Sequence, residues 1–159
     1  MKVLHITNNY PTNKYPIFGI FVKEQINSLS EIGINSDLLF INARENGKCE
    51  YISSIFSLKK ILKNNSYDII HCHHTFSAFI LFLSTLFKKK KNRYVVSFQC
   101  DPSKEFFGIL YFLIRTKFDA FIYKNKFNFI DSKSYYLPNG VNEKFFKNFQ
   151  KFNFPSLAA

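Results

Sequence analysis

The stretch "YDIIHCHHTFSAFILFLSTLFKKKKNRYVVSFQ", residues 67–99, decides the fold of this sequence. Its two ends, residues 67–74 and 93–99, are short apolar runs that predict strands. Residues 76–88 between them predict a buried helix, because their apolar run is shorter than the roughly 20 residues that a membrane span needs. A strand, a helix and a second strand in succession are typical of a parallel sheet covered by helices.

The same alternation continues toward both ends of the chain. Further strands are expected at residues 2–7, 36–43, 118–125 and 134–139, and further helices at 20–32, 54–63 and 104–118. The strands are mostly apolar on both faces, as parallel strands buried between helices are. We therefore predict an α/β fold, a parallel sheet covered by helices on both faces. Ligands bind such sheets at the carboxyl ends of the strands, so the residues that follow each strand are the candidates for a site.

The composition limits the class of protein and its surroundings. The 159 residues are 47% hydrophobic, which is enough for one domain with a core, and carry a formal net charge of +11. That charge favours nucleic acids, anionic lipids or phosphorylated ligands as partners, although the abundance of Lys, Asn, Ile and Phe also fits a general composition bias. Cys49, Cys72 and Cys100 form no C-x-x-C pair, and no leader peptide shows at the start. We expect a cytoplasmic protein that can lie peripherally at the inner face of a membrane.

Two of the strand ends carry a glycine or histidines. Gly19 opens the first long helix, where free backbone N–H groups favour a phosphate, or where the glycine serves only the turn. After the third strand, His71 and His73 share one face, whereas Cys72 and His74 point to the other. Each face supplies at most two ligands, so the pattern favours histidines that contact a ligand or solvent at the mouth of the sheet over a metal site. We expect no metal and no cofactor.

The end of the fourth strand offers hydrogen-bonding groups without an obvious nucleophile. Gln99 and Asp101 follow this strand, and Ser97 precedes them. The sequence has no G-x-S-x-G nucleophile elbow, and it also lacks the glycine-rich fingerprints of dinucleotide-binding and P-loop proteins. These groups therefore predict a ligand-binding cleft, and the reaction is left open.

Four stretches, in their order along the chain, resemble the N-terminal domain of GT-B glycosyltransferases of the retaining family 4. They are "KVLHITNNYPT…PIFGIFVKEQINSLSEIGINSDLL", "YDIIHCHHTFSA", "RYVVSFQCDPS" and "YLPNGVNEKFF". The resemblance implies a Rossmann-like domain at residues 1–146. Residues 147–159 would then be a tail or the start of a linker to a second, donor-binding domain that this sequence does not include.

The resemblance also implies an activity and a set of site residues. The parent enzyme would transfer a sugar from a nucleotide-diphosphate donor to a lipid-linked or surface-glycan acceptor, as in polysaccharide assembly, and this chain alone would be inactive. The implied residues are Phe18 and Gly19 in the donor-phosphate loop, Gln99 and Asp101 in catalysis, His73 and His74 in the acceptor cleft, and Pro138, Asn139 and Gly140 at the inter-domain hinge.

Two departures from the family pattern keep other functions open. Cys100 stands where the family has a glycine, and Pro102 stands where it usually has an acidic residue. The alternatives are a split enzyme whose second domain is a separate chain, a non-catalytic remnant, and a basic module that binds an anionic membrane or nucleic acid. The lysines are spread along the chain and not interleaved with aromatics on one face, which disfavours nucleic acid.

Overall fold

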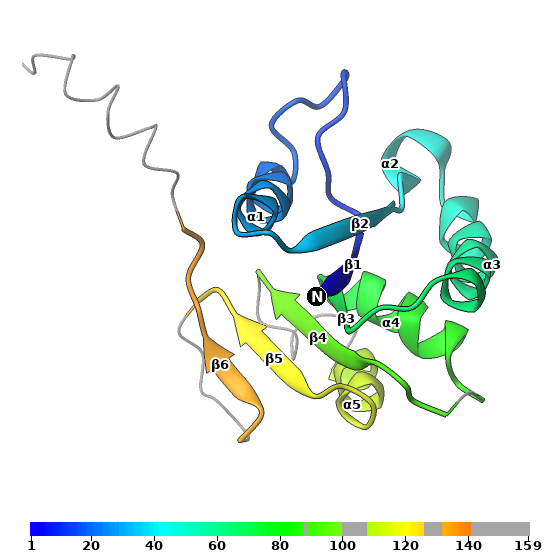
Figure 1. Cartoon of the computed structure of the whole chain (residues 1–159). Helices are drawn as coiled ribbons and strands as arrows, with labels where there is room; N and C mark the ends of the chain where they lie inside the picture. Colours follow the sequence, from blue (N-terminus) through cyan, green and yellow to red (C-terminus); the bar gives the residue numbers. More distant parts are fainter. Residues whose placement is uncertain (88, 100–107, 126–131, 141–159) are drawn as a thin grey trace, which may run out of the picture.

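A six-stranded parallel sheet forms the centre of the fold (Figure 1). The computed structural model describes residues 1–87, 89–99, 108–125 and 132–140. The strands are β1 (Lys2–Thr7), β2 (Asn35–Phe40), β3 (Ile69–His73), β4 (Arg93–Phe98), β5 (Ala120–Tyr123) and β6 (Ser134–Tyr136). They lie side by side in the order β2-β1-β3-β4-β5-β6, and every neighbouring pair is parallel. The predicted Rossmann-like α/β fold is confirmed.

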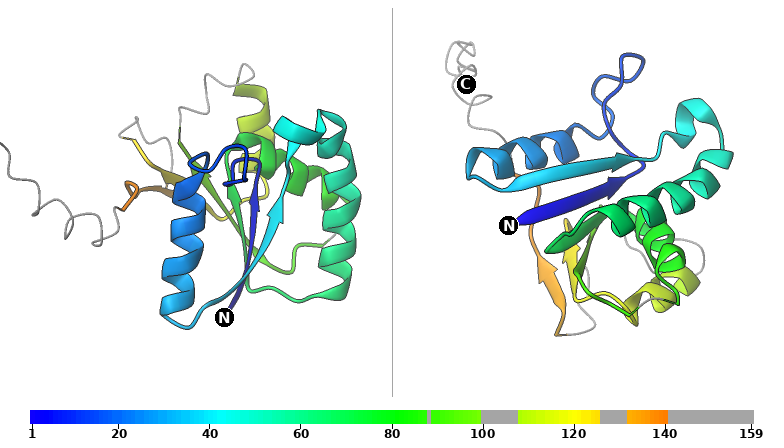
Figure 2. Two further views of the ribbon diagram at one scale, coloured as in Figure 1. Left: turned by 90° about the horizontal axis from the view of Figure 1, so that it is seen from above. Right: turned by 45° about the vertical axis from the view of Figure 1, so that its right-hand side comes forward.

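The helices lie on the two sides of this sheet. They are α1 (Ile20–Glu31), α2 (Ala43–Asn46), α3 (Cys49–Asn64), α4 (Thr75–Ser84) and α5 (Ile109–Arg115). Figure 2 shows α1 on one face of the sheet and α3 on the other, and α4 and α5 pack on the side of α3. Among the described residues, α1 is thus the one helix that covers its face.

Two of the helix ends follow from local chemistry. Gly33, predicted to stop α1, has a φ of 77° and donates its N–H to Ser30 O, as a C-terminal glycine does. The helix predicted over residues 76–88 ends at Ser84. There the Thr85 hydroxyl and N–H both donate back to Leu81 O and so close the last turn.

Most of the apolar core lies on the face that α3, α4 and α5 cover, while Val3 of β1 and Val22 of α1 are buried on the other face. Every second residue of the strands contributes to it, namely Leu4, Ile6, Ile70, Cys72, Tyr94, Val96, Phe98, Phe121 and Tyr123. Leu58 of α3, Leu81 of α4 and Ile114 of α5 pack against them, and all three are 0% exposed. Each such side chain contributes roughly 1.5–3 kcal/mol when it leaves water, so this face supplies most of the stability.

The opposite face of the three central strands is polar and is nevertheless buried. Five polar residues alternate with the core residues and are at most 6% exposed, namely His5, Thr7, His71, His73 and Ser97. The strand register places His5 opposite His71, and His73 opposite Ser97. The prediction that the strands are apolar on both faces is therefore wrong for β1, β3 and β4.

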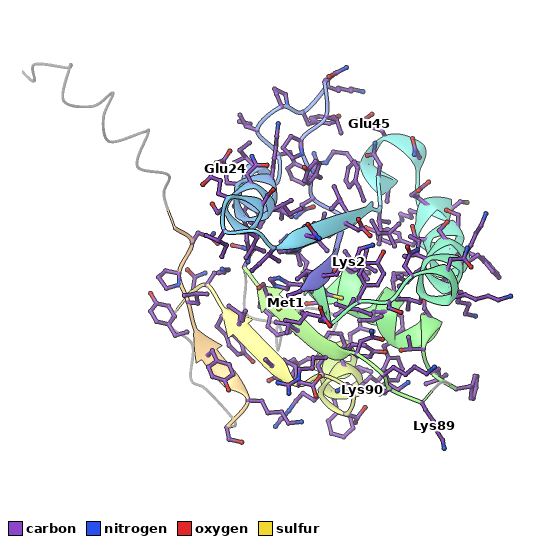
Figure 3. All side chains as sticks on the ribbon, in the orientation of Figure 1. Met1, Lys2, Glu24, Glu45, Lys89 and Lys90 are labelled. Atoms are coloured by element: carbon purple, nitrogen blue, oxygen red, sulfur yellow. The ribbon has the colours of Figure 1, made fainter. Side chains whose placement is uncertain are left out.

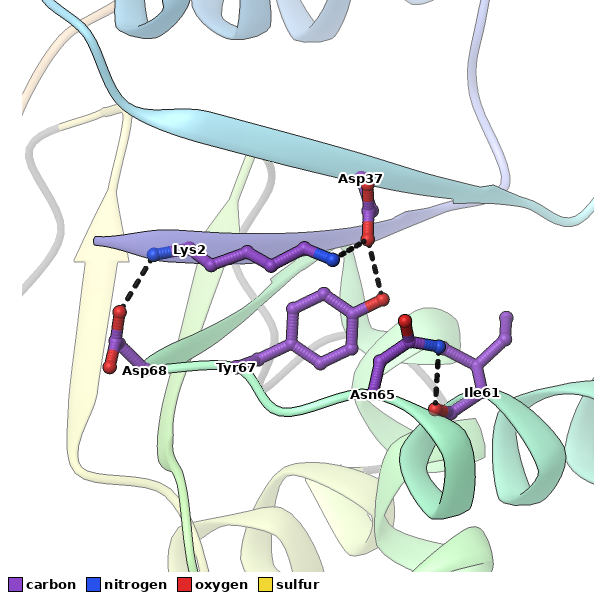
Figure 4. Close-up of polar contacts among 6 residues, drawn as sticks. All are labelled: Lys2, Asp37, Ile61, Asn65, Tyr67 and Asp68. Carbon is purple, nitrogen blue, oxygen red and sulfur yellow. Dashed lines mark hydrogen bonds and ion pairs between the residues drawn. The ribbon is translucent and has the colours of Figure 1, made fainter.

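A polar network closes the sheet at the amino ends of β1 and β2 (Figure 4). Asp37 accepts from Tyr67 Oη at 2.7 Å and forms an ion pair with Lys2 Nζ at 2.8 Å, while the Lys2 N–H donates to Asp68. The Lys2 ammonium also lies 4.9 Å from the centre of the Tyr67 ring. This end of the sheet is thus tied by charged groups, far from the carboxyl ends where a ligand would bind.

Several other charged side chains lie on the outside. Glu45, Lys89 and Lys90, labelled in Figure 3, are exposed at the periphery of the fold. None of the helices in the described part of the chain is long and apolar enough to cross a membrane.

Candidate functional site at the carboxyl ends of β1, β3 and β4

The strand order reverses between β1 and β3. β1 has β2 on one side and β3 on the other, and the helices that follow β1 and β2, α1 and α3, lie on opposite faces of the sheet (Figure 2). At such a reversal the two connections diverge and leave a crevice outside the carboxyl ends of the strands. The loops after β1 and β3 therefore form the walls of the candidate site.

Gly19 fixes the loop that leaves β1. It has a φ of 69°, and a Cβ at this position would lie 2.2 Å from Asn9 O and 2.7 Å from Tyr10 N. Only glycine permits this close approach of two backbone segments, so the loop is pressed against the start of α1. This accounts for Gly19 through the turn itself, and the donor-phosphate role of Phe18 and Gly19 stays a prediction.

His74 connects the β3 end to this loop. Asn9 Nδ2 donates to His74 Nε2 at 2.8 Å, so the proton of the neutral ring lies on Nδ1. Burial lowers the pKa of His74 to about 4, which keeps the ring neutral near pH 7. The ring of Phe21, on α1, meets His74 edge-on at 6.0 Å. His74 also has a φ of 80°, the only positive value at a described residue other than glycine, and such strain gathers at functional sites.

His71 and His73 lie below this edge, inside the fold. They are 6% and 1% exposed, so of the two predicted contacts the structure excludes solvent, and contact with a ligand stays a prediction. His71 Nε2 is 2.7 Å from Ser97 Oγ, and His73 Nε2 is 3.1 Å from His5 Nδ1. His73 is predicted to contribute to the acceptor cleft, and it would have to do so from its buried position beneath His74.

Among the described residues, three buried histidines form the group that could hold a metal ion. The nitrogens of His5, His71 and His73 lie within 4.8 Å of one another. Burial lowers the pKa of His5 to about 4 and that of His71 to about 3, and it holds the pKa of His73 well below its usual value. Neutral imidazole is the form that binds metal, but three nitrogens are one short of a structural zinc site, and here they bond to each other and to Ser97.

Gln99 and the hinge turn lie together at the next strand ends. Asn139 Nδ2 donates to Gln99 Oε1 at 3.0 Å, and Asn125 Nδ2 donates to the Gln99 carbonyl at 2.8 Å. The first bond joins the end of β4 to the turn after β6, which contains Pro138, Asn139 and Gly140, and the second joins it to the residues after β5. Asp101 lies outside the described residues, as do Cys100, Pro102 and residues 141–159, so the structure does not place them.

Four buried side-chain atoms in the described part of the chain have no hydrogen-bond partner. They are Asn8 Oδ1, His73 Nδ1, Thr75 Oγ1 and Gln99 Nε2. All four belong to residues at or just after the carboxyl ends of β1, β3 and β4. Buried polar atoms are nearly always paired, so four exceptions at one edge of the sheet make this edge the candidate site.

Comparison with known proteins identifies the family of this chain. The family model for "Glycosyl transferase 4-like" proteins matches residues 20–129. The chain belongs to the glycosyl transferase 4-like family. Among solved structures, MurG of Acinetobacter baumannii matches 96% of this chain at 9% identity with a TM-score of 0.49, and the chain spans 50% of the length of that MurG chain. No curated protein matches the sequence.

Asn9 and Lys124 are among the polar residues of this glycosyl transferase 4-like chain that sequence reasoning missed. Asn9 holds His74, and Lys124 lines a cavity of about 270 Å³ between α1 and the hinge turn, together with Glu24 and Asn139. Burial lowers the pKa of Lys124. Both residues follow strands, β1 and β5, so the rule that selected Gln99 could have selected them as well.

Proposed function

We propose that this chain is the acceptor-side half of a glycosyltransferase that moves a sugar from a nucleotide-diphosphate donor to an acceptor hydroxyl. The second half, which binds most of the donor, belongs to another domain, whether in a longer chain or in a separate one. The observation that carries the proposal is the set of unpaired polar atoms of Asn8, His73, Thr75 and Gln99 at the crevice of a family member. In this proposal, a polyhydroxylated substrate supplies the hydrogen bonds that these atoms lack.

In the proposed reaction, the bond between the anomeric carbon of the sugar and the donor diphosphate breaks. A new bond to the acceptor oxygen forms, the hydroxyl proton passes to an oxygen of the departing diphosphate, and the nucleoside diphosphate leaves. Backbone N–H groups near Phe18 and Gly19 would stabilise the charge that develops on the diphosphate. Gln99 would bind the transferred sugar, and the neutral His74 would offer its Nδ1–H to an acceptor oxygen.

Half of such a site does not enclose both substrates, so the chain alone should not turn over. Positioning and exclusion of water both require the second wall of the cleft. The test measures nucleoside diphosphate release from a panel of UDP-, GDP- and ADP-sugars, with the purified chain alone and with its donor-binding domain. We expect no release from the chain alone and release from the pair.

Site variants sharpen this test. Gln99→Ala should abolish release by the pair, whereas Lys60→Ala, an exposed residue on α3, should leave it unchanged. Turnover by the chain alone would overturn the half-site proposal. An inactive pair, with every donor and a range of acceptors, would overturn the transfer itself and favour a remnant or a binding module.

A peripheral membrane location is a second proposal, and the outer face of α3 favours it. Ile52 and Phe56 are 62% and 66% exposed there, and Lys59 Nζ lies 5.8 Å from the centre of the Phe56 ring. Apolar side chains beside lysines on one helix face suit the surface of an anionic bilayer. Sedimentation with vesicles tests this: we expect binding to anionic vesicles that Phe56→Asp weakens, and equal sedimentation with neutral vesicles would exclude it.

A further inference from the structure

The buried histidines on the α1 side of the sheet converge from two neighbouring strands. His71 and His73 lie on one face of β3, which by itself supplies two ligands. β1 runs parallel to β3, and its register places His5 directly opposite His71, so a third imidazole joins the same face. The ring centre of His5 is 5.4 Å from those of both His71 and His73, which are 4.2 Å from each other. The pairing of the strands thus brings together three rings.

The spacing of the ring nitrogens is close to the spacing that one metal ion imposes. One nitrogen from each of the three rings lies within 4.8 Å of the other two, and His5 Nδ1 is 3.1 Å from His73 Nε2. Zinc–nitrogen bonds are about 2.0–2.1 Å long, so two nitrogens on one tetrahedral zinc ion lie about 3.4 Å apart. Each ring would therefore have to move by less than about 1 Å to share an ion.

The hydrogen bonds of the cluster allow an ion to replace a proton. His5 Nδ1 and His73 Nε2 face each other, and one proton joins them. His5 Nε2 is 3.4 Å from Ser36 Oγ, which can accept the proton of that ring when Nδ1 binds an ion. His73 Nδ1 is buried and has no hydrogen-bond partner in the described part of the chain, so no second bond fixes the proton of this ring. Both facing nitrogens can therefore offer a lone pair.

The donor atoms select the class of ion. Imidazole nitrogen suits Zn²⁺, Cu²⁺ and Ni²⁺, whereas Mg²⁺ and Ca²⁺ prefer oxygen. Among the described residues, the group contains no aspartate or glutamate. Three protein nitrogens are the set found in zinc sites that keep a fourth position for water. The Ser97 hydroxyl, 2.7 Å from His71 Nε2, borders the cluster and offers an oxygen near that position.

We propose that His5, His71 and His73 bind one transition-metal ion of the zinc class, which ties β1 to β3 beneath the carboxyl edge of the sheet. The two strands lie on either side of the reversal in strand order, so the ion would hold the floor of the crevice in place. The three rings are at most 6% exposed, which indicates a structural role. This inference goes beyond the proposed function, because it involves neither donor nor acceptor and can be tested on the chain alone.

The experiment loads the ion during folding, since the rings are buried in the folded chain. The chain is unfolded in urea with a chelator, refolded with Co²⁺, Zn²⁺ or Mg²⁺, and passed through a gel-filtration column. We expect one Co²⁺ or Zn²⁺ per chain, an absorption spectrum of tetrahedral Co²⁺ without a thiolate charge-transfer band, and no retained Mg²⁺. Free Zn²⁺ at 100 times its Kd should raise the equilibrium constant for folding about 100-fold, measured by urea unfolding.

Four variants locate the ion. His71→Gln and His73→Gln each remove one of the three nitrogens, so neither variant should retain Co²⁺ on the column. His74→Gln is the matched control, because it changes the next histidine along the chain, whose ring is not in the group. It should retain the ion, as should Cys49→Ser, which removes an exposed thiol. Urea unfolding in the chelator shows whether each variant folds, and His5→Gln takes the place of one that does not.

The contrary results are distinct. A refolded wild-type chain that retains neither Co²⁺ nor Zn²⁺ would overturn the site. Retention by folded His71→Gln and His73→Gln, or a thiolate band in the Co²⁺ spectrum, would place the ion elsewhere and overturn the assignment to these rings. Loss of the ion from His74→Gln would do the same. If the ion binds as expected while the assembled pair transfers no sugar, the metal site stands and the glycosyltransferase proposal fails.

Discussion

The two faces of the sheet are built from the same strands but by different chemistry. On the side of α3, α4 and α5, residues such as Ile70 and Phe98 form a closed apolar core. On the side of α1, their immediate neighbours, such as His71 and Ser97, are equally buried and are polar. Successive side chains of a strand point to opposite faces, so the contrast changes with every residue along β3 and β4. Stability and the candidate site are thus divided between the faces.

This division has an energetic consequence. The apolar face gains free energy in proportion to the area it removes from water. The polar face must pair each buried group, and it does so with bonds such as the one between His71 and Ser97 until the carboxyl edge, where four atoms stay unpaired. We therefore expect the polar face to be the more sensitive of the two to pH and to the loss of single polar atoms.

Lowering the pH should destabilise the polar face more than the apolar face. This loss of stability is the largest effect that we expect. Burial holds the pKa of His5 at about 4 and that of His71 at about 3, and it keeps that of His73 well below normal, whereas in the unfolded chain they titrate near 6.5. Below pH 6.5 the unfolded chain therefore binds protons that the folded chain does not. Stability should be complete above about pH 7 and fall between pH 6.5 and 4, by roughly 2 kcal/mol for each histidine at pH 5.

Urea unfolding at pH 7.5, 6 and 5 checks this prediction. The variant His5→Gln removes one of the titrating groups, so its stability should fall less steeply, by about 1.4 kcal/mol per pH unit near pH 5. Equal stability of the wild type at pH 7.5 and pH 5 would show that the histidines are not held neutral in the folded chain.

Two neighbouring residues of β4 compare the faces directly. Phe98→Ala should cost about 4 kcal/mol, because the ring is 1% exposed and packs against Phe121 and Tyr123 in the core. Ser97→Ala removes one buried oxygen and leaves His71 Nε2 without its bond, which should cost about 1–2 kcal/mol. Equilibrium unfolding of both variants at pH 7.5 measures the difference. A larger loss for Ser97→Ala would reverse the assignment of stability to the apolar face.

The two glycines at the ends of α1 separate local strain from close packing. Gly19→Ala should cost about 3 kcal/mol, since its Cβ would combine a left-handed backbone with a clash against Asn9 O. Gly33→Ala has the same backbone conformation, but nothing lies within 4 Å of its Cβ, so it should cost only about 1 kcal/mol. Unfolding of both variants measures the difference. Equal losses would mean that the loop after β1 moves away freely from α1.

The sequence predicted the elements of this fold better than their faces. Local signals sufficed for β3, for the buried α4 and for the stop of α1 at Gly33, because each depends on a few adjacent residues. The polar face depends on register: His5 meets His71 only because β1 pairs with β3, and no local pattern encodes that pairing.

The candidate site shows the same limit. Gln99 was selected because it follows a strand, and its contact with Asn139 joins residues 40 positions apart. Asn9 and His74 are 65 positions apart, so their bond could be found only from the fold. The rule that residues after parallel strands form the site selects the carboxyl edge of the sheet, whereas the pairing of residues within that edge follows only from the fold.

We expect the smallest loss of stability at polar groups that border the apolar face and are exposed to solvent. Asp37 has a pKa lowered by its hydrogen bonds with Lys2 and Tyr67, and the side chains of the Asp37–Lys2 pair are 45% and 38% exposed. Water and salt screen such a pair, so Asp37→Asn should cost less than about 1 kcal/mol at pH 7.5, although it breaks an ion pair and Ser97→Ala does not. Because the folded pKa is depressed, this contribution is present above about pH 4 and is lost only at lower pH.

Unfolding at 0.05 and 0.5 M NaCl should show the difference between Asp37→Asn and wild type shrink with salt, while the cost of Ser97→Ala stays constant. A cost for Asp37→Asn above that of Ser97→Ala would show that burial does not decide how much a polar group of this sheet contributes.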